Sequence, residues 1–181
     1  MTRSLVLRPT TDRRRLRRRG FPAILAVAAA TAWCAAANAE IPAAVAVPGA
    51  AIIATAHAEG AQVYDCKPDA QGQNIWQFRE PIATLMIDGK TVGRHYEGPS
   101  WELKDGGAVT AKAAGRAPGA TAADIPWLKL DVATRRGSGQ ISAATKVQRL
   151  NTQGGALEGA CSAAGATKSV PYAADYVFLK D

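Results

Sequence analysis

Residues 83–93 read Ala83-Thr84-Leu85-Met86-Ile87-Asp88-Gly89-Lys90-Thr91-Val92-Gly93, and this run decides the fold. The residues on both sides of Asp88-Gly89 are rich in apolar and β-branched side chains, which favour extended strands. An Asp-Gly pair between two such runs is typical of a tight β-hairpin, because both residues tolerate the positive φ angles of the turn. The run therefore predicts two antiparallel strands joined by a two-residue turn.

Short runs of the same kind recur along the chain, with turn residues about every eight to twelve positions. They are the segments 62–66, 75–78, 101–103, 108–112, 125–132, 146–150 and 172–179. In the clearest of them, Leu128, Leu130 and Val132 alternate with Lys129 and Asp131, so one face is apolar. The pattern predicts a single all-β domain, an antiparallel β-sandwich or barrel. The alanine-rich stretch Ala50–Ala61 leaves a helix open as an alternative there.

The first 39 residues have the composition of a signal peptide. Eight arginines among residues 1–19 precede an apolar stretch from Phe21 to Trp33, and small residues at Ala37 and Ala39 favour cleavage before Glu40. The apolar stretch is short against the roughly 20 residues that span a bilayer, so we expect no membrane span after cleavage. We expect an exported protein, periplasmic or extracellular, with a signal peptide at 1–39, an extended lead-in at 40–51 and a β domain at 52–181. The choice between the general and the twin-arginine export route stays open.

Removal of residues 1–39 changes the charge of the chain. Of the 22 basic and 15 acidic residues, 14 of each remain, so the net charge falls from +7 to zero. A neutral chain gives no support to a nucleic-acid or anionic-membrane partner. The remaining cysteines, Cys66 and Cys161, are expected to form a disulfide in an oxidising compartment, since they lack the Cys-x-x-Cys spacing of redox-active pairs.

The segment Gly93–Glu102 contains the densest set of chemically active side chains. These are Arg94, His95, Tyr96, Glu97, Trp101 and Glu102. His95 with Glu97 or Glu102 is a candidate catalytic pair of a hydrolase, and paired acids beside aromatic rings suit a glycan substrate. His95 with carboxylates such as Glu102 or Asp105 would make an unusual ligand set for zinc and a nonspecific one for manganese or calcium, so no metal or other cofactor is predicted. We favour the interpretation that His95 hydrogen-bonds a tight loop shaped by Gly98-Pro99.

Three tryptophans remain after the leader, at positions 76, 101 and 127. Most tryptophans in a domain of this size belong to the core, and Trp127, which opens the clearest strand, is the best candidate for a core position. Trp101 is expected to be the most exposed of the three. An exposed indole beside a hollow would suit a sugar or another flat ligand.

The motifs together resemble those of one family of exported proteins, catalogued as domain of unknown function 3455. The matching pieces are Val63–Cys66, Trp76 with Phe78, Pro81–Leu85, Gly93–Glu102, Asp105-Gly106, Ile125–Leu128, Val147–Gly155, Cys161 and Val170–Tyr176. The resemblance covers nearly the whole chain after residue 39. It implies no reaction, ligand or catalytic residue, because the family has none assigned.

The sequence predicts a binding module of the cell envelope whose partner is a small molecule, a glycan or an envelope protein. Its predicted contact region is the segment Gly93–Glu102. A hydrolase and a purely structural envelope protein are the alternatives. A hydrolase requires His95 and a carboxylate within hydrogen-bond reach of each other. A structural protein requires that the side chains of the motif are buried and that their polar groups are paired with one another.

Overall fold

A computed structural model describes residues 40–181 as an all-β domain. The predicted signal peptide and its cleavage after Ala39 lie outside the described residues. The strands are β1 (Ala51–Pro68), β2 (Asn74–Ile87), β3 (Lys90–Tyr96), β4 (Ser100–Leu103), β5 (Ala108–Ala117), β6 (Trp127–Arg136), β7 (Lys146–Gly154) and β8 (Thr167–Lys180). A single 3₁₀ turn, η1 (Gln140–Ala143), precedes β7. Between residues 40 and 181, no helix is long and apolar enough to cross a membrane.

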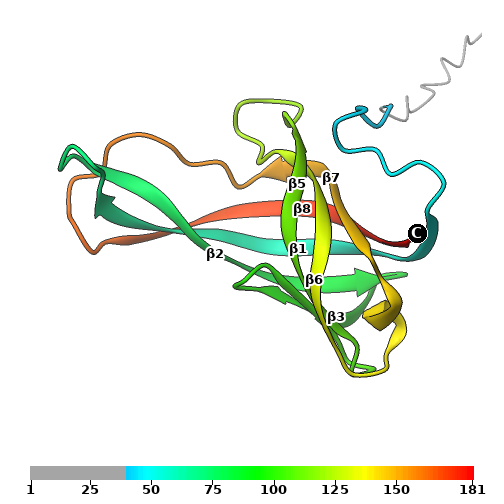
Figure 1. Ribbon diagram of the computed structural model, residues 1–181. Helices are drawn as coiled ribbons and strands as arrows, with labels where there is room; N and C mark the ends of the chain where they lie inside the picture. Colours follow the sequence, from blue (N-terminus) through cyan, green and yellow to red (C-terminus); the bar gives the residue numbers. More distant parts are fainter. Residues whose placement is uncertain (1–39) are drawn as a thin grey trace, which may run out of the picture. The chain divides into compact units, whose positions relative to one another are not determined.

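The eight strands form a closed antiparallel barrel (Figure 1). Each strand pairs with the next along the chain, and β8 returns to pair with β1 over Ala51–Asp65, which closes the sheet. The predicted fold class is confirmed, and of the two predicted architectures the chain adopts the barrel. Closure leaves no free sheet edge within the barrel itself.

The Ala50–Ala61 stretch is extended and not helical, since β1 begins at Ala51. Ala54, Ala56 and Ala58 alternate with exposed neighbours and point into the core. Their small side chains suit a position where β1 lies between β2 and β8 and the barrel interior is crowded by aromatic rings. The period of two therefore decides the structure here, against the helix propensity of alanine.

The predicted hairpin is confirmed as β2–β3. Asp88 and Gly89 have φ angles of 50° and 71°, as the two central residues of a tight hairpin turn require. At the end away from this hairpin, β2 extends past the barrel. Along its first half, β2 pairs with β1, which pairs on its other side with β8, and Ile75 also bridges Ala160 in the segment after β7. The three strands make an arm that projects from the barrel, to the left in Figure 1.

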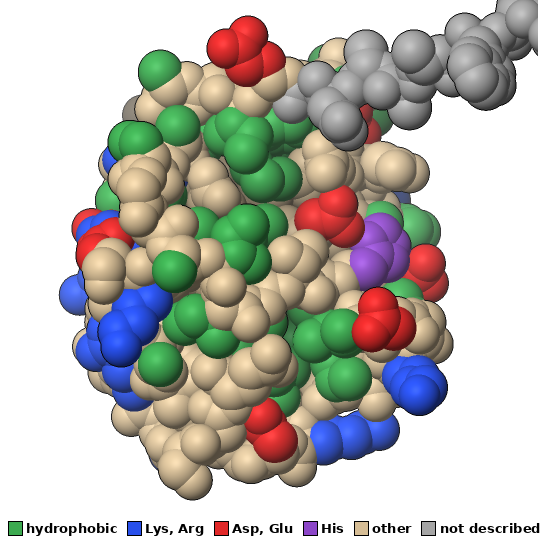
Figure 2. Space-filling model, turned by 90° about the vertical axis from the view of Figure 1, so that its right-hand side faces the viewer, with side chains coloured by type: hydrophobic (Ala, Val, Ile, Leu, Met, Phe, Trp, Pro, Cys, Tyr) green, Lys and Arg blue, Asp and Glu red, His purple; other side chains and the backbone are tan. Residues whose placement is uncertain are grey.

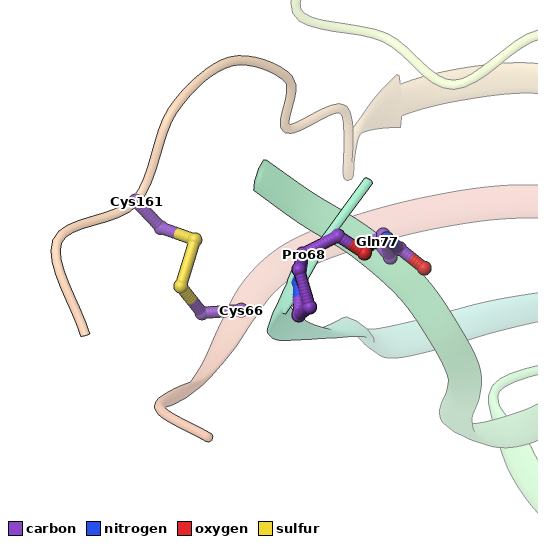
Figure 3. The surroundings of a disulfide bond; sticks show 4 residues. All are labelled: Cys66, Pro68, Gln77 and Cys161. Carbon is purple, nitrogen blue, oxygen red and sulfur yellow. Dashed lines mark hydrogen bonds between the residues drawn. A yellow bond between two sulfur atoms is a disulfide. The ribbon is translucent and has the colours of Figure 1, made fainter. Parts of the chain in front are cut away.

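The Cys66–Cys161 disulfide closes the outer part of this arm (Figure 3). It joins the end of β1 to the connection between β7 and β8, with the two Cα atoms 5.9 Å apart. The Gln77 side-chain amide donates to the Pro68 carbonyl at 3.2 Å and links the ends of β1 and β2. The predicted disulfide is confirmed, and it fixes the otherwise strand-free segment 155–166 to the sheet.

Two hydrophobic clusters lie on opposite sides of the barrel wall. The interior cluster contains the side chains of Leu85, Trp101, Leu130, Tyr176 and Phe178, among others. As predicted, Leu128, Leu130 and Val132 share the face of β6 that packs against this cluster. Trp127 is on the other face of β6 and is buried in the second cluster.

The second cluster is covered by the segment before β1. Val45 is fully buried there against Trp127, Leu150 and Leu179, on the outside of β6, β7 and β8. Val45 is positioned by a turn, because its backbone amide donates to the Pro42 carbonyl at 2.9 Å. The Gln148 side-chain amide donates to the Val45 carbonyl at 2.7 Å. The lead-in is thus attached to the barrel by packing and by a buried hydrogen bond.

Candidate functional site

The segment Gly93–Glu102 forms the hairpin of β3 and β4. Arg94 pairs with Glu102, His95 with Trp101, and Tyr96 with Ser100. The Ser100 hydroxyl donates to the Glu97 carbonyl at 2.7 Å across the connecting turn. Because cross-strand partners point to the same side of a sheet, the hairpin separates the motif into two groups.

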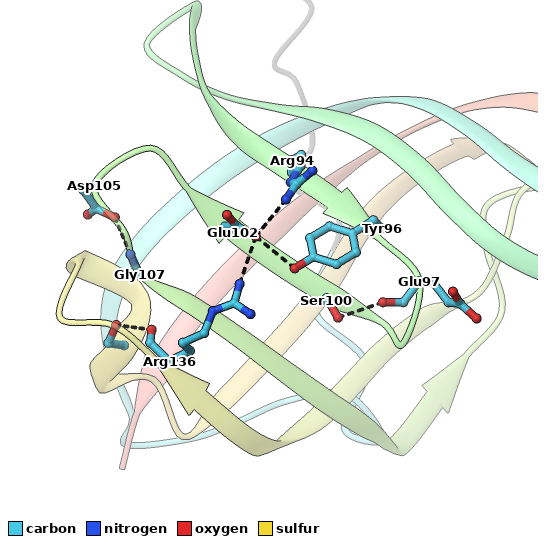
Figure 4. A network of polar contacts seen from close by, with 9 residues as sticks. Arg94, Tyr96, Glu97, Ser100, Glu102, Asp105, Gly107 and Arg136 are labelled. Carbon is cyan, nitrogen blue, oxygen red and sulfur yellow. Dashed lines mark hydrogen bonds and ion pairs between the residues drawn. The ribbon is translucent and has the colours of Figure 1, made fainter.

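One group lies outside the barrel around the Glu102 carboxylate (Figure 4). Its Oε2 accepts hydrogen bonds from the Tyr96 hydroxyl at 3.0 Å, from Arg136 at 3.0 Å and from Arg94 at 3.2 Å. The Arg94 guanidinium also lies 4.8 Å from the centre of the Tyr96 ring. The hydrogen bond from Tyr96 and that from Arg94 lower the pKa of Glu102. Glu102 is therefore an ionised carboxylate occupied by surface partners.

The other group lies inside the barrel. The His95 ring is buried and stacks on Trp101, and its Nδ1 donates to the Ser100 carbonyl at 2.8 Å. This bond leaves Nε2 as the unprotonated nitrogen of the neutral ring. Burial lowers the pKa of His95 to about 3. The ring is therefore neutral at physiological pH and fixes the turn, as the structural interpretation of His95 expects.

The predicted catalytic pairs are not brought together. Across residues 40–181, neither Glu97 nor Glu102 makes a hydrogen bond or ion pair with His95. Glu97 lies in the exposed turn after β3, and Glu102 faces away from the barrel interior. The hydrolase hypothesis required a His95–carboxylate contact, and the geometry does not supply it.

Trp101 differs from the expectation that it is the most exposed tryptophan, since only 1% of its surface is accessible. The Gly98-Pro99 turn is short, so His95 and Trp101 remain direct partners and both point inward. Trp76, on the arm, is half-buried with the Lys168 ammonium 6.0 Å from its ring centre. Trp127 is buried, as predicted.

A pocket of about 830 Å³ opens into the barrel beside the β3–β4 turn. The motif supplies His95 and Trp101 to its wall and the Glu97–Pro99 turn to its mouth. The wall is completed by residues from six other strands, among them Gln62, Tyr64, Leu130, Arg149 and Tyr176. None of these residues belongs to the site predicted from the sequence.

Two buried polar atoms in the wall of this pocket have no partner in the described chain. They are the side-chain nitrogen Nε2 of Gln62 and the indole Nε1 of Trp101. Tyr64, by contrast, donates to the Gly155 carbonyl at 2.6 Å. Both nitrogens are shielded from solvent, and the Gln62 side chain lies beside the Tyr172 hydroxyl.

In the part of the chain that the structure describes, no three acidic, histidine or cysteine side chains are arranged to hold a metal ion. Asp105, a possible ligand beside His95, accepts bonds from the backbone amides of Gly107 and Gln140 instead. The second histidine, His57, pairs with Asp175 at 2.8 Å.

On the face shown in Figure 2, basic side chains gather along the left edge, and acidic and hydrophobic side chains are distributed over the rest. The numbers of acidic and basic residues after position 39 are equal. The pocket beside the β3–β4 turn has the volume of a small-molecule binding site.

The comparisons with known proteins agree with the resemblance seen in the sequence. A family model described as protein of unknown function (DUF3455) matches residues 47–180. No curated protein and no solved structure matches the chain.

Proposed function

The chain belongs to the DUF3455 family, and we propose that it is an exported module that binds a small molecule inside its barrel. The observation that carries this proposal is the pocket of about 830 Å³ whose wall contains His95, Trp101 and Gln62. Small-molecule sites commonly measure about 300–1,000 Å³, with apolar walls and a few polar groups. Eight-stranded barrels are also about the size that holds one small ligand.

The wall has the composition that such a site requires. Leu128, Leu130 and the Trp101 ring provide apolar surface, and the half-buried Arg149 is a polar group that can orient a ligand. His95 contributes in a different way. It is locked by its bond to Ser100 and by stacking on Trp101, so it holds the indole in position. A wall that is rigid before binding reduces the entropy lost on binding.

Export is proposed from the leader and the disulfide together. The arginine-rich, apolar leader supports cleavage before Glu40, and the Cys66–Cys161 bond fits an oxidising compartment. Mass spectrometry of the protein from the periplasm or the culture medium tests this. A mature chain that begins at Glu40 is expected, and a full-length chain confined to the cytoplasm contradicts it.

Binding can be tested with N-phenyl-1-naphthylamine, a neutral probe whose fluorescence rises in apolar surroundings. The chain from Glu40 onward is expected to bind it. Ala113 is exposed and lines the pocket, whereas its neighbour Ala114 is exposed and does not line it. Ala113→Trp is expected to fill the mouth and weaken binding, and Ala114→Trp is the matched control. Absence of probe binding in the wild type, or equal binding by both variants, contradicts the proposal.

A further inference from the structure

An arginine points into the pocket from β7. Arg149 is the cross-strand partner of Tyr176 in β8 and of Leu128 in β6, and all three line the pocket. Residues paired across strands share a face, so the guanidinium belongs to the interior. Arg149 is half-buried. Its Nε donates to the Pro126 carbonyl at 3.0 Å, which holds the side chain in place.

No negative charge inside the barrel balances Arg149. Throughout the described chain, the ion pairs involve Arg79, Arg94, Arg136, Lys67, Lys146 and His57, and none includes Arg149. The titratable groups that share the interior with it are neutral, and a carboxylate outside, that of Glu158, acts with Arg149 on the pKa of Tyr64. Burial raises the pKa values of Tyr172 and Tyr176 and lowers that of His95. A half-buried charge without a counter-ion is unusual, because burial of charge is costly unless the charge is paired.

Two further N–H groups lie in the wall near this charge. Gln62 Nε2 and Trp101 Nε1 are shielded from solvent and make no hydrogen bond within the described chain. The half-buried guanidinium is therefore the wall's accessible donor, and an acceptor-rich group fits it. The remaining wall is apolar and partly aromatic, with Tyr64, Ile125 and Leu130.

The mouth carries charges of both signs. Arg79 is paired there with Asp65 and Glu80, whereas Arg116 and Glu97 are exposed. Solvent screens exposed charges of this kind, so they contribute less to the choice of ligand than the half-buried Arg149.

We infer that the ligand is an organic carboxylate with an apolar, ring-sized body, its carboxylate bound by Arg149 and its body held among the aromatic and aliphatic side chains of the wall. A carboxylate presents two acceptor oxygens in a plane, which matches the fork of N–H donors on a guanidinium. The inference rests on the proposed function, since it names the class of ligand that the same pocket takes.

The test compares 2-naphthoate with 2-naphthamide, which share a body and differ in charge. Calorimetric titration of the wild-type chain is expected to show that the acid binds at least tenfold more tightly, a difference of about 1.4 kcal/mol. Arg149→Gln is expected to remove this preference while leaving the amide's affinity within about threefold. Arg136→Gln is the matched control, because Arg136 is exposed and does not line the pocket.

The outcomes separate the two proposals. Equal affinities for acid and amide in the wild type, or a preference that survives Arg149→Gln, overturn the carboxylate inference and leave the pocket as a neutral binding site. Failure of both naphthalenes while N-phenyl-1-naphthylamine still binds also overturns it. Failure of all three compounds overturns the proposed binding function itself. Circular dichroism and melting curves of each variant establish that a loss of binding is not a loss of folding.

Discussion

His95 lies face to face with Trp101 inside the barrel, with ring centres 4.6 Å apart and ring planes within 10° of parallel. The two residues are direct partners across β3 and β4, and Tyr176 contacts both rings from β8. The motif that suggests a catalytic histidine thus contributes a rigid aromatic stack to the pocket wall. A stacked, neutral histidine serves this purpose, whereas a charged one would have to be desolvated.

The buried histidine predicts a pH-dependent stability. The pKa of His95 is about 3 in the folded chain against 6.5 for an ordinary histidine, so the unfolded chain binds a proton first as pH falls. The contribution of neutral His95 to the free energy of unfolding is therefore complete above pH 6.5, and it is lost as the pH falls from 6.5 to 3. Between pH 7 and pH 5 the free energy of unfolding should fall by about 2 kcal/mol on this account.

Urea unfolding at the two pH values measures this loss. His95→Asn, whose amide can still donate to the Ser100 carbonyl, should be less stable at pH 7 but should lack this part of the pH dependence. If His95→Asn and the wild type lose equal stability between pH 7 and pH 5, the histidine is not neutral and buried in solution.

Reduction of the disulfide should destabilise the domain strongly. Cys66 and Cys161 are 95 residues apart, and closing a loop of that length stabilises by up to about 4.7 kcal/mol on the chain-entropy model. A calorimetric melt with reductant should therefore show a melting temperature lower by about 10 °C or more. The double variant Cys66→Ala, Cys161→Ala should melt like the reduced wild type and should not respond to reductant. A wild-type melt unchanged by reductant contradicts the prediction.

Gly93 should tolerate no side chain. A Cβ at this position would lie 2.2 Å from the Glu102 carbonyl oxygen on β4, and backbone atoms cannot move aside cheaply. Gly93→Ala is expected to cost about 3 kcal/mol in urea unfolding. Gly89, in the turn of the preceding hairpin, has open space around it and a φ of +71°. Gly89→Ala should cost only about 1 kcal/mol, from backbone strain alone, and equal losses would show that β3 and β4 separate easily.

Local patterns made part of this fold predictable. The Asp88-Gly89 turn follows from backbone preferences, and the alternation of Leu128 and Leu130 in β6 follows from the two-residue period of a strand. The pairing of the cysteines follows from the redox environment. Each of these causes acts over a short distance or leaves few alternatives. Closure of the barrel depends instead on β1 pairing with β8, more than a hundred residues away along the chain. No local signal in the sequence specifies that partner.

The site was predicted less completely than the fold, for a related reason. The motif at Gly93–Glu102 was found by its composition, but its division into an inner and an outer group depends on the short turn at Gly98-Pro99. Arg149 was missed although a signal was present. It shares the face of β7 with the buried Val147, and a charged residue on an apolar strand face is a candidate for a site. That signal has meaning only once β7 is known to be part of a closed barrel.

The Glu102 network should prove separable from binding. Glu102 binds Tyr96, Arg94 and Arg136 on the outer side of the β3–β4 hairpin and is not among the residues that line the pocket. Glu102→Gln keeps the shape of the side chain but removes the charge that holds two arginines, so the melting temperature should fall slightly and the loss should shrink in high salt. The affinity for N-phenyl-1-naphthylamine should stay within about twofold, because the inner faces of His95 and Trp101 are unchanged. A large loss of probe affinity at an unchanged melting temperature would place Glu102 in the binding site and would show that the two sides of the hairpin act together.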